Sequence, residues 1–480
     1  MHWIDYLIIF GYLGILIAIG IFFLKKQSTV DEYFVGDRKM GSGHVGFSVV
    51  ATDVGGGFSI GLGGVGFLMG LSGSWLLFTG LVGAWLSAVI LIPKVKFLGD
   101  KYNLLSFPDF LERRYDRRTR LLSSVVSGIG YATFVGAQTL AGAKLSSAAF
   151  NIDLTTAVLI MSAVVIIYTA FGGLQAVIYT DSLQWFVLLS GLLFLALPLG
   201  YREVGGLEGM RAALPPEFFT LTNISGEKFF TWMFTIIPIW FVGMTLYQRM
   251  YATRDVKTAR RAWYLAGLLE YPLMSFLGVG LGMFGRIMFP EAESEMGLPL
   301  LIKNVLPVGA VGVVLAAYFS AIMSTADSCL LASVGNFVND LYQKYINPDA
   351  PEKKVLLISR LMTVGVGIIS VAVALGIPKV LDSMLLAYKF MVSGLFIPTI
   401  AGILFKRVSA AAALLSIIVG GVTSILLELN MFSMLNPWDD SILIALPLSL
   451  IAIIIGTAIW PSDGSDKFTD DIEELNKMKL

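Results

Sequence analysis

Two segments of the sequence place polar residues inside long apolar stretches. The first segment, ATDVGGGFS, carries Asp53 beside three consecutive glycines, Gly55, Gly56 and Gly57. A carboxylate at the centre of a membrane helix costs about 2.5–3.5 kcal/mol to insert, and glycine inside a helix is about 1 kcal/mol less favourable than alanine. A close contact between two helices would explain both features. We favour a helix broken at membrane depth, whose freed backbone groups line a wet cavity and bind an ion or a solute.

The second segment, AAYFSAIMSTADSCLLAS, gathers hydroxyl groups and one carboxylate on a short stretch of predicted helix. These residues are Ser320, Ser324, Thr325, Asp327 and Ser328. Ser324 and Ser328 are four residues apart and therefore share one face of a helix. Single hydroxyls often bond back to their own helix, but this cluster exceeds that need. Oxygen ligands without His or Cys indicate a hard cation, and mainly neutral oxygens favour Na⁺ over Ca²⁺.

A third polar residue, Asp181, stands at the start of an apolar stretch, after YTAFGGLQAVIYT. From its position alone we expect it to cap the N-terminus of a helix, where a negative charge is favoured. Nothing in the apolar stretches indicates an enzyme, because none carries a nucleophile beside a base and both histidines are isolated.

The whole composition explains where these residues must lie. The 480 residues are 56% apolar and 14% charged, with a mean hydropathy of +0.78, whereas soluble proteins are about 45–50% apolar and about 25% charged. The formal charge of zero gives no attraction to nucleic acid, and two histidines and one cysteine leave no Cys/His metal site and no intramolecular disulfide. The composition excludes a DNA-binding protein, a secreted disulfide scaffold and a zinc enzyme. It predicts an all-α polytopic membrane protein.

Thirteen apolar stretches are long enough to cross about 30 Å of hydrocarbon, which needs roughly 20 residues. They lie near 6–24, 43–68, 74–93, 121–147, 154–171, 182–200, 230–248, 262–288, 305–336, 356–376, 380–405, 408–429 and 440–460. The first stretch lacks a basic region and a cleavage site, so we expect it to be retained.

Basic residues indicate the orientation of these spans. With the N-terminus outside, 24 Lys and Arg residues, Arg249 among them, fall in inside loops and five in outside loops. Membrane proteins carry such an excess on the cytoplasmic side. We therefore expect the N-terminus outside, the C-terminus inside, and residues 461–480 as a solvated cytoplasmic tail.

The arrangement of the spans predicts an internal repeat within a single transmembrane domain, residues 1–480. Spans 2–6, about 43–200, and spans 7–11, about 230–405, form two sets of five. Because five is odd, the sets have opposite orientations, and such inverted repeats place a binding site near the midplane between broken helices. Span 7 is then expected to break at Pro238 or Gly243, although a proline can also merely kink a helix.

Three segments together resemble the solute:sodium symporter family. YTAFGGLQAVIYTDSLQ is similar to its signature before span 6, and ATDVGGG and AIMSTADS are similar to its sodium-site segments. The resemblance covers nearly the whole chain. It implies a five-plus-five inverted repeat of the leucine-transporter type, with 13 spans. It also implies Na⁺-driven uptake of a solute across a bacterial cytoplasmic membrane.

The resemblance further implies which residues bind sodium. The shared sodium site would use the backbone carbonyl groups of Ala51, Val54 and Ala321 and the hydroxyl groups of Ser324 and Thr325. Asp53 resembles the carboxylate that proline symporters need for sodium coupling. Some members bind a second sodium, and the matching positions are Asp181, Asp327 and Ser328. This gives Asp181 a second interpretation besides the helix cap.

The solute follows less directly from the resemblance. Aromatic positions of the choline-transporter branch fall on Asp53 and Gly243, and a glutamine of the sugar branch falls on Phe58, so choline and sugars are disfavoured. We expect proline or another small amino acid; a small carboxylate or vitamin (pantothenate-like) and a sugar are alternatives. The solute would contact Gly55, Gly56, Phe58, Gln138 and Trp240, with Trp240 as a lid.

The expected partners are Na⁺, the solute and membrane lipid, without nucleic acid, in a monomer or an oligomer. An ion channel is the alternative of another class. It would need rings of charged or carbonyl groups from oligomeric symmetry, whereas this chain has one internally repeated unit.

Overall fold

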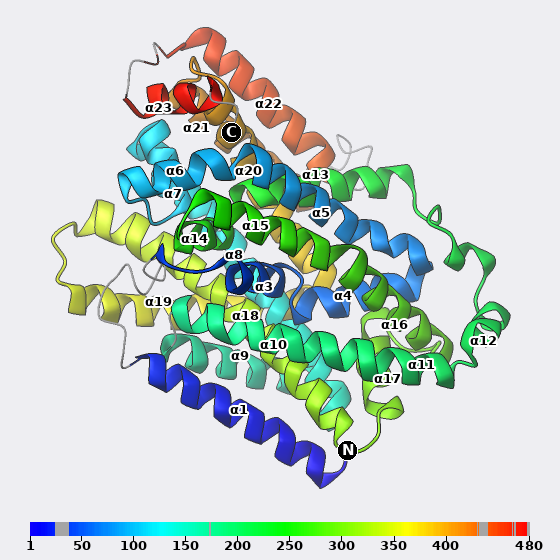
Figure 1. Cartoon of the computed structure of the whole chain (residues 1–480). Helices are drawn as coiled ribbons and strands as arrows, with labels where there is room; N and C mark the ends of the chain where they lie inside the picture. Colours follow the sequence, from blue (N-terminus) through cyan, green and yellow to red (C-terminus); the bar gives the residue numbers. More distant parts are fainter. Residues whose placement is uncertain are drawn as a thin grey trace.

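The apolar stretches of the sequence form long helices that run side by side across the molecule (Figure 1). The structure is a computed structural model that describes residues 1–24, 38–171, 174–429, 431, 440–462, 464 and 467–477. Gly172 and Gly173 of the predicted signature segment lie outside the described residues. Within the described ranges all regular secondary structure is helical, apart from one isolated β-bridge between Met40 and Thr253.

The first half of the chain contributes the helices that carry the predicted span 2 and the spans around it. They are α1 (Trp3–Leu24), α3 (Ser42–Asp53), α4 (Gly56–Met69), α5 (Trp75–Ile90), α6 (Ile92–Tyr102), α7 (Phe107–Arg114), α8 (Arg117–Phe150), α9 (Leu154–Phe171), α10 (Leu174–Gly191), α11 (Leu197–Glu203) and α12 (Gly206–Ala213). The long α8 begins where the Asp116 side chain accepts a hydrogen bond from the Thr119 amide, as preferred helix-capping residues do.

The second half of the chain repeats this pattern of long and interrupted helices. They are α13 (Gly226–Val242), α14 (Met244–Ala252), α15 (Val256–Leu268), α16 (Ser275–Met288), α17 (Gly297–Val305), α18 (Ala310–Gly335), α19 (Glu352–Gly376), α20 (Val380–Leu404), α21 (Ala410–Glu428), α22 (Ile442–Ile459) and α23 (Lys467–Lys477). Short 3₁₀ or π-helical segments join several of them, at Gly70–Ser74, Leu192–Ala196, Pro216–Phe219, Leu269–Met274, Ser294–Met296 and Asn336–Ile346.

The helices are suited to a membrane. In the described part of the chain, nine helical stretches are long and apolar enough to cross a bilayer, or ten when the bent pair α13–α14 is one span. The predicted apolar stretches coincide with helices, but the number of thirteen crossings stays a prediction.

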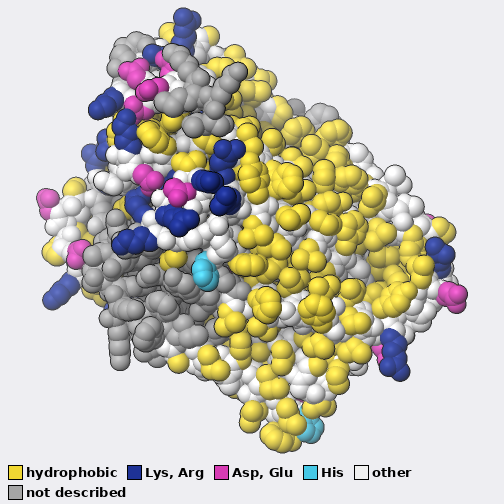
Figure 2. All heavy atoms as spheres, in the orientation of Figure 1, with side chains coloured by type: hydrophobic (Ala, Val, Ile, Leu, Met, Phe, Trp, Pro, Cys, Tyr) yellow, Lys and Arg dark blue, Asp and Glu magenta, His cyan; other side chains and the backbone are white. Residues whose placement is uncertain are grey.

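Figure 2 shows a broad apolar face, and Phe194 and Leu361 are 69% and 63% exposed. Lys and Arg gather at the end of the molecule that holds α6 and α7.

Two predicted helix breaks are confirmed. The chain leaves the helical conformation between α3 and α4 at Val54 and Gly55, where Gly55 has ψ −170°. The chain also leaves the helical conformation between α13 and α14, at Gly243, where the axes of the two helices are bent by 43°. Pro238 lies inside α13 without ending it. Glycine rather than proline therefore sets the break in span 7.

Helix α18 is the centre of the bundle, because nearly all of its residues are buried. It packs against α3, α4, α8, α10 and α14. The hydroxyl-rich segment of α18 therefore faces protein on all sides instead of lipid. A third interruption lies in the π-helical segment between α15 and α16, which packs against α5 and where Tyr271 has non-helical angles.

The C-terminal segment differs from the prediction of a solvated tail. Its described part forms α23, which packs on α6 and α7. Phe468, Ile472 and Leu475 are buried, and Asp471 pairs with Lys101 at 2.6 Å. The many acidic residues make this segment resemble a solvated tail. Its apolar residues nevertheless recur every three or four positions, as in an amphipathic helix.

Candidate functional site

The hydroxyl group of Thr325, in the middle of α18, joins α18 to the end of α3. Its oxygen lies 3.0 Å from the carbonyl oxygen of Ala51 and 3.1 Å from that of Ala321. Ser324 donates to the same Ala321 carbonyl at 3.4 Å, and Val54 directly follows the last residue of α3. The structure thus brings the residues of the predicted sodium site together at the break between α3 and α4.

This meeting of α3, α4 and α18 depends on Gly55. A β-carbon at position 55 would lie 2.0 Å from Thr325 Oγ1 and 2.6 Å from the Ala51 carbonyl oxygen, so a side chain would push α18 away. The oxygen atoms that meet here are buried and uncharged. Hard neutral oxygens of this kind suit a sodium ion.

Arg249 of α14 places a buried positive charge close to these oxygens. Its Nε donates to Ser48 Oγ at 3.0 Å, and its Nη2 donates to Asp181 Oδ2 at 3.2 Å and to Ser328 Oγ at 3.1 Å. It also donates to the hydroxyl of Thr52. Ser48 in turn donates to Asp181 at 2.6 Å. The guanidinium therefore links α3, α10 and α18 to α14.

The position of Asp181 corrects one prediction and changes another. Asp181 lies seven residues inside α10 and not at its N-terminus, so the predicted helix cap is wrong. The position expected for a second sodium ion, between Asp181 and Ser328, holds the guanidinium of Arg249. Asp327 interacts electrostatically with both Asp181 and Arg249. The positive charge beside these carboxylates thus belongs to the protein itself.

Sequence reasoning missed Arg249 because it ends an apolar stretch and therefore resembles a residue of an inside loop. The predicted break at Gly243 was the available signal. A helix that restarts after a break carries its next residues back into the bundle, and α14 extends from Met244 to Ala252 with every residue buried.

Asp53 forms a second polar centre at the same break. Its Oδ1 accepts a hydrogen bond from the Tyr388 hydroxyl at 3.2 Å, and its carboxyl group lies next to that of Glu270. Glu270 is fully buried. Sequence reasoning overlooked Glu270, although a carboxylate inside the apolar stretch 262–288 carries the same signal as Asp53.

A small internal cavity of about 20 Å³ adjoins Asp53 and lies between the two broken helices. Its walls include the rings of Tyr131, Phe134 and Tyr388, together with Gly243 at the α13–α14 break. Phe134 and Tyr388 are stacked with ring centroids 5.0 Å apart. The cavity therefore combines aromatic walls with one carboxylate.

None of the five predicted solute contacts is among the described residues that line this cavity, although Phe58 lies beside one of its walls. Gly55 and Gly56 stand at the start of α4, and the Phe58 ring lies 6.2 Å from that of Tyr388. The amide group of Gln138 packs against Gly57, where a β-carbon would lie 2.4 Å from its Oε1.

Trp240 does not cover the cavity, which corrects the expectation of a lid. Its ring packs against Gly83 of α5 and, with centroids 6.5 Å apart, against Trp263 of α15. A side chain on α13 can face either the cavity or α5, and hydropathy along the segment does not distinguish these two faces.

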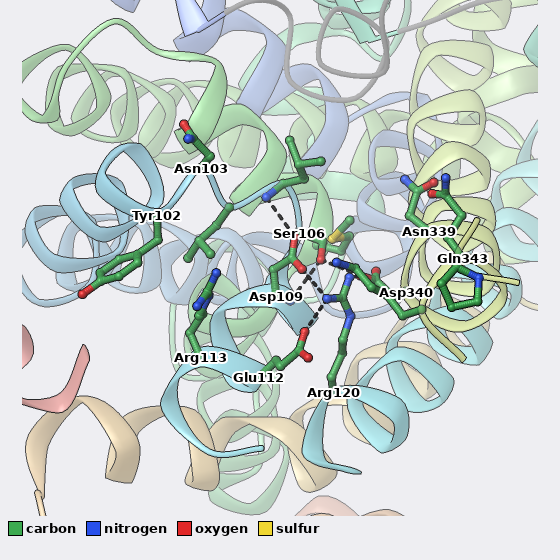
Figure 3. A pocket seen from close by; sticks show the side chains of 15 residues that line it. Tyr102, Asn103, Ser106, Asp109, Glu112, Arg113, Arg120, Asn339, Asp340 and Gln343 are labelled. Atoms are coloured by element: carbon green, nitrogen blue, oxygen red, sulfur yellow. Dashed lines mark hydrogen bonds and ion pairs between the residues drawn. The ribbon is translucent and has the colours of Figure 1, made fainter. Parts of the chain in front are cut away.

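A larger pocket of about 730 Å³ opens at the end of the molecule where basic residues gather. Figure 3 shows Arg120 in its wall, in contact with Asp109, Glu112 and Asp340. The pocket reaches Met244, the first residue of α14. Because the neighbours of Met244 line the central cavity, the α13–α14 break separates the pocket from the cavity.

Comparison with known proteins agrees with this geometry. The family model described as "Sodium:solute symporter family" matches residues 33–420. The sodium/pantothenate symporter of Escherichia coli is 30% identical over 94% of this chain and 96% of its own length. The high-affinity proline transporter PutP of Bacillus subtilis is 27% identical over 86% of this chain and 89% of its own length.

Solved structures show the same fold. A substrate-bound, outward-open Na⁺-coupled sialic acid symporter matches with a TM-score of 0.78 at 23% identity, over 96% of this chain and 99% of the other. Mhp1, a nucleobase-cation-symport-1 family transporter, matches with a TM-score of 0.58 at 14% identity, over 93% and 99%. The predicted leucine-transporter-type fold is confirmed. The chain therefore belongs to the sodium:solute symporter family, and it is a membrane transporter with sodium as its coupling ion and not an enzyme.

Proposed function

We propose that this transporter imports a small amino or imino acid, such as proline, together with one sodium ion. The observation that carries the proposal is the break between α3 and α4. It places the neutral oxygens of Ala51, Ala321 and Thr325 on one side and the Asp53 carboxylate with its aromatic cavity on the other. A sodium ion at the break would hold α3 and α4 in the shape that binds the solute.

The two ends of an amino acid fit the two broken ends of span 2. The Ser59 amide donates to the Gly55 carbonyl at 3.1 Å and begins the bonding of α4, so the three preceding amides are not used within the helix. The N-terminus of a helix favours a carboxylate. The ammonium group would then lie toward Asp53, beside the aromatic rings that also favour a cation.

The transport cycle follows from the two cavities. Sodium and solute bind at the α3–α4 break, and movement at the Gly243 break then connects the central cavity with the pocket at the basic end. That end would face the cytoplasm of a bacterial inner membrane, with the N-terminus outside. One charge crossing 100 mV supplies about 2.3 kcal/mol, and a tenfold sodium gradient adds about 1.4 kcal/mol. Together they support about 500-fold accumulation of a neutral solute.

A pantothenate-like carboxylate is the second candidate, supported by the 30% identity to the sodium/pantothenate symporter. Two carboxylates at the site, Asp53 and Glu270, would repel such an anion. Uptake into proteoliposomes distinguishes the candidates. We expect saturable, sodium-dependent uptake of proline or another amino acid and none of pantothenate. Sodium-driven pantothenate uptake without amino-acid uptake would reject the proposed solute, and current without a solute would indicate a channel.

A further inference from the structure

Glu270 is a buried carboxyl group whose two oxygens lack a hydrogen-bond donor among the described residues. It is 0% exposed, and neither of its oxygens receives a hydrogen bond from a donor in the described ranges. Its Oε2 lies against α5, since a β-carbon at Gly80 would be 2.3 Å from it. Buried polar groups in native proteins are nearly always hydrogen-bonded. Within the described part of the chain, Glu270 therefore lacks the hydrogen-bond donor that a buried carboxyl group normally has.

The direction in which Glu270 points is set by the interruption of its helix. Glu270 precedes Tyr271, whose backbone is extended with φ −133° and ψ 127°. This interruption brings the carboxyl group into contact with that of Asp53 on the broken span 2. Two broken helices thus each present one carboxylate to the same point.

Two carboxylates in contact repel each other unless they share a proton or a positive group lies between them. At Asp181 the protein supplies that group as Arg249. At Asp53 and Glu270 it does not, because no Lys, Arg or His in the described part of the chain forms an ion pair with either residue. Within these residues the pair therefore has no cation of the protein's own, and a bound cation would take the place of a shared proton.

The surroundings indicate which cation this is. Asp53 borders a cavity with the aromatic walls of Tyr131, Phe134 and Tyr388, whereas the neutral hard oxygens that suit sodium lie at Ala51, Ala321 and Thr325. Aromatic faces attract organic cations. We propose that Asp53 and Glu270 together form the subsite for the protonated amine of the solute, with each carboxylate accepting one N–H group. This inference rests on the proposed amino-acid function and narrows it to primary or secondary amines.

The test compares three ligands with one skeleton: proline, cyclopentanecarboxylate without the amine, and N,N-dimethylproline with the charge but no N–H group. Thermal shifts of the purified full chain in sodium give their affinities. If another of the twenty amino acids gives a larger shift than proline, the same three variants are made of it. We expect the amine-bearing ligand to bind at least about 100-fold more tightly than either analogue, because sites built to bind N–H groups reject analogues without them.

Glu270→Gln should weaken binding of the amine at least tenfold and leave the thermal shift by sodium alone unchanged. Glu208→Gln, on the exposed part of α12, is the matched control and should change neither. Gly80→Ala provides a second variant in case Glu270→Gln does not fold. It keeps the carboxylate but displaces it, and should weaken the amine ligand in the same direction.

Three results would overturn the inference. Native affinity for the amine in both Glu270→Gln and Gly80→Ala removes the subsite but leaves amino-acid transport standing. A reduced shift by sodium alone in Glu270→Gln assigns a sodium ion to the pair. Sodium-dependent stabilisation by pantothenate or a hexose, and by no amine, rejects the subsite together with the proposed function.

Discussion

Two polar regions lie one turn apart on α18 and differ in the groups that they offer to a buried cation. Around Thr325, backbone carbonyls and hydroxyls converge, and in the described residues no charged side chain is bonded to Thr325 or to the carbonyl groups of Ala51 and Ala321. Around Ser328, Asp181 is paired with the guanidinium of Arg249. The first region suits a mobile ion, and the second already contains a cation that is attached to the chain.

This difference explains how one helix can both bind the coupling sodium ion and hold the neighbouring helices in place. A sodium ion that binds neutral oxygens can leave without stranding a buried charge, whereas a buried ion pair is strongly destabilised when one partner is removed. We therefore expect the Thr325 region to bind and release sodium during transport and the Arg249 region to hold α3, α10, α14 and α18 together.

Gly55→Ala should have the largest effect on the Thr325 region. The new β-carbon would lie 2.0 Å from Thr325 Oγ1 and would separate α3 from α18. Misplacement of a binding group by about 1 Å can lower activity about 100-fold, and we expect at least that loss of sodium-driven uptake. Gly365→Ala is the matched control, since no atom lies within 4 Å of a β-carbon there. Normal sodium-dependent uptake by Gly55→Ala would contradict this account.

Arg249→Met should destabilise the protein by about 3–5 kcal/mol, because it leaves Asp181 buried without its partner. The double variant Asp181→Asn with Arg249→Met removes both charges and should recover most of that loss. Thermal unfolding of the single and double variants in detergent measures the recovery. A double variant less stable than either single variant would show that the pair is not the main role of Arg249.

Ser328→Ala should have the smallest effect of these changes. It removes one hydrogen bond to the guanidinium, worth at most about 1.5–3 kcal/mol, while oxygens of Ser48, Thr52, Asp181 and Thr245 still accept from it. Stability should fall slightly, and the sodium constant of uptake should not change. An increased sodium constant would move the sodium site toward Ser328.

Local features of the sequence were sufficient to predict the broken helices and the hydroxyl groups of the sodium region, whereas the backbone carbonyl groups of Ala51, Val54 and Ala321 followed from the family resemblance. Glycines next to Asp53 and hydroxyls close together on α18 are visible within single segments. The sequence could not predict which basic residue would reach Asp181, because Arg249 lies 68 positions away and ends an apolar stretch. Contacts between distant helices depend on how the bundle packs.

The same limit applies to the solute region. Glu270 meets Asp53 only because the segment between α15 and α16 is interrupted at Tyr271. Trp240 turns toward α5 because Gly83 leaves room for its ring. Both positions result from the shapes of two elements together, which hydropathy along one segment does not report.

The central claim, that sodium binds at Thr325 and Arg249 replaces a second ion, is tested most directly by sodium titration of uptake. The native chain should show a Hill coefficient of about one. Ser324→Ala with Thr325→Ala should raise the apparent sodium constant at least tenfold, or about 1.4 kcal/mol, while Ser328→Ala leaves it unchanged. An unchanged constant in the double variant, or a native Hill coefficient above one that falls to one in Asp181→Asn, would contradict the claim.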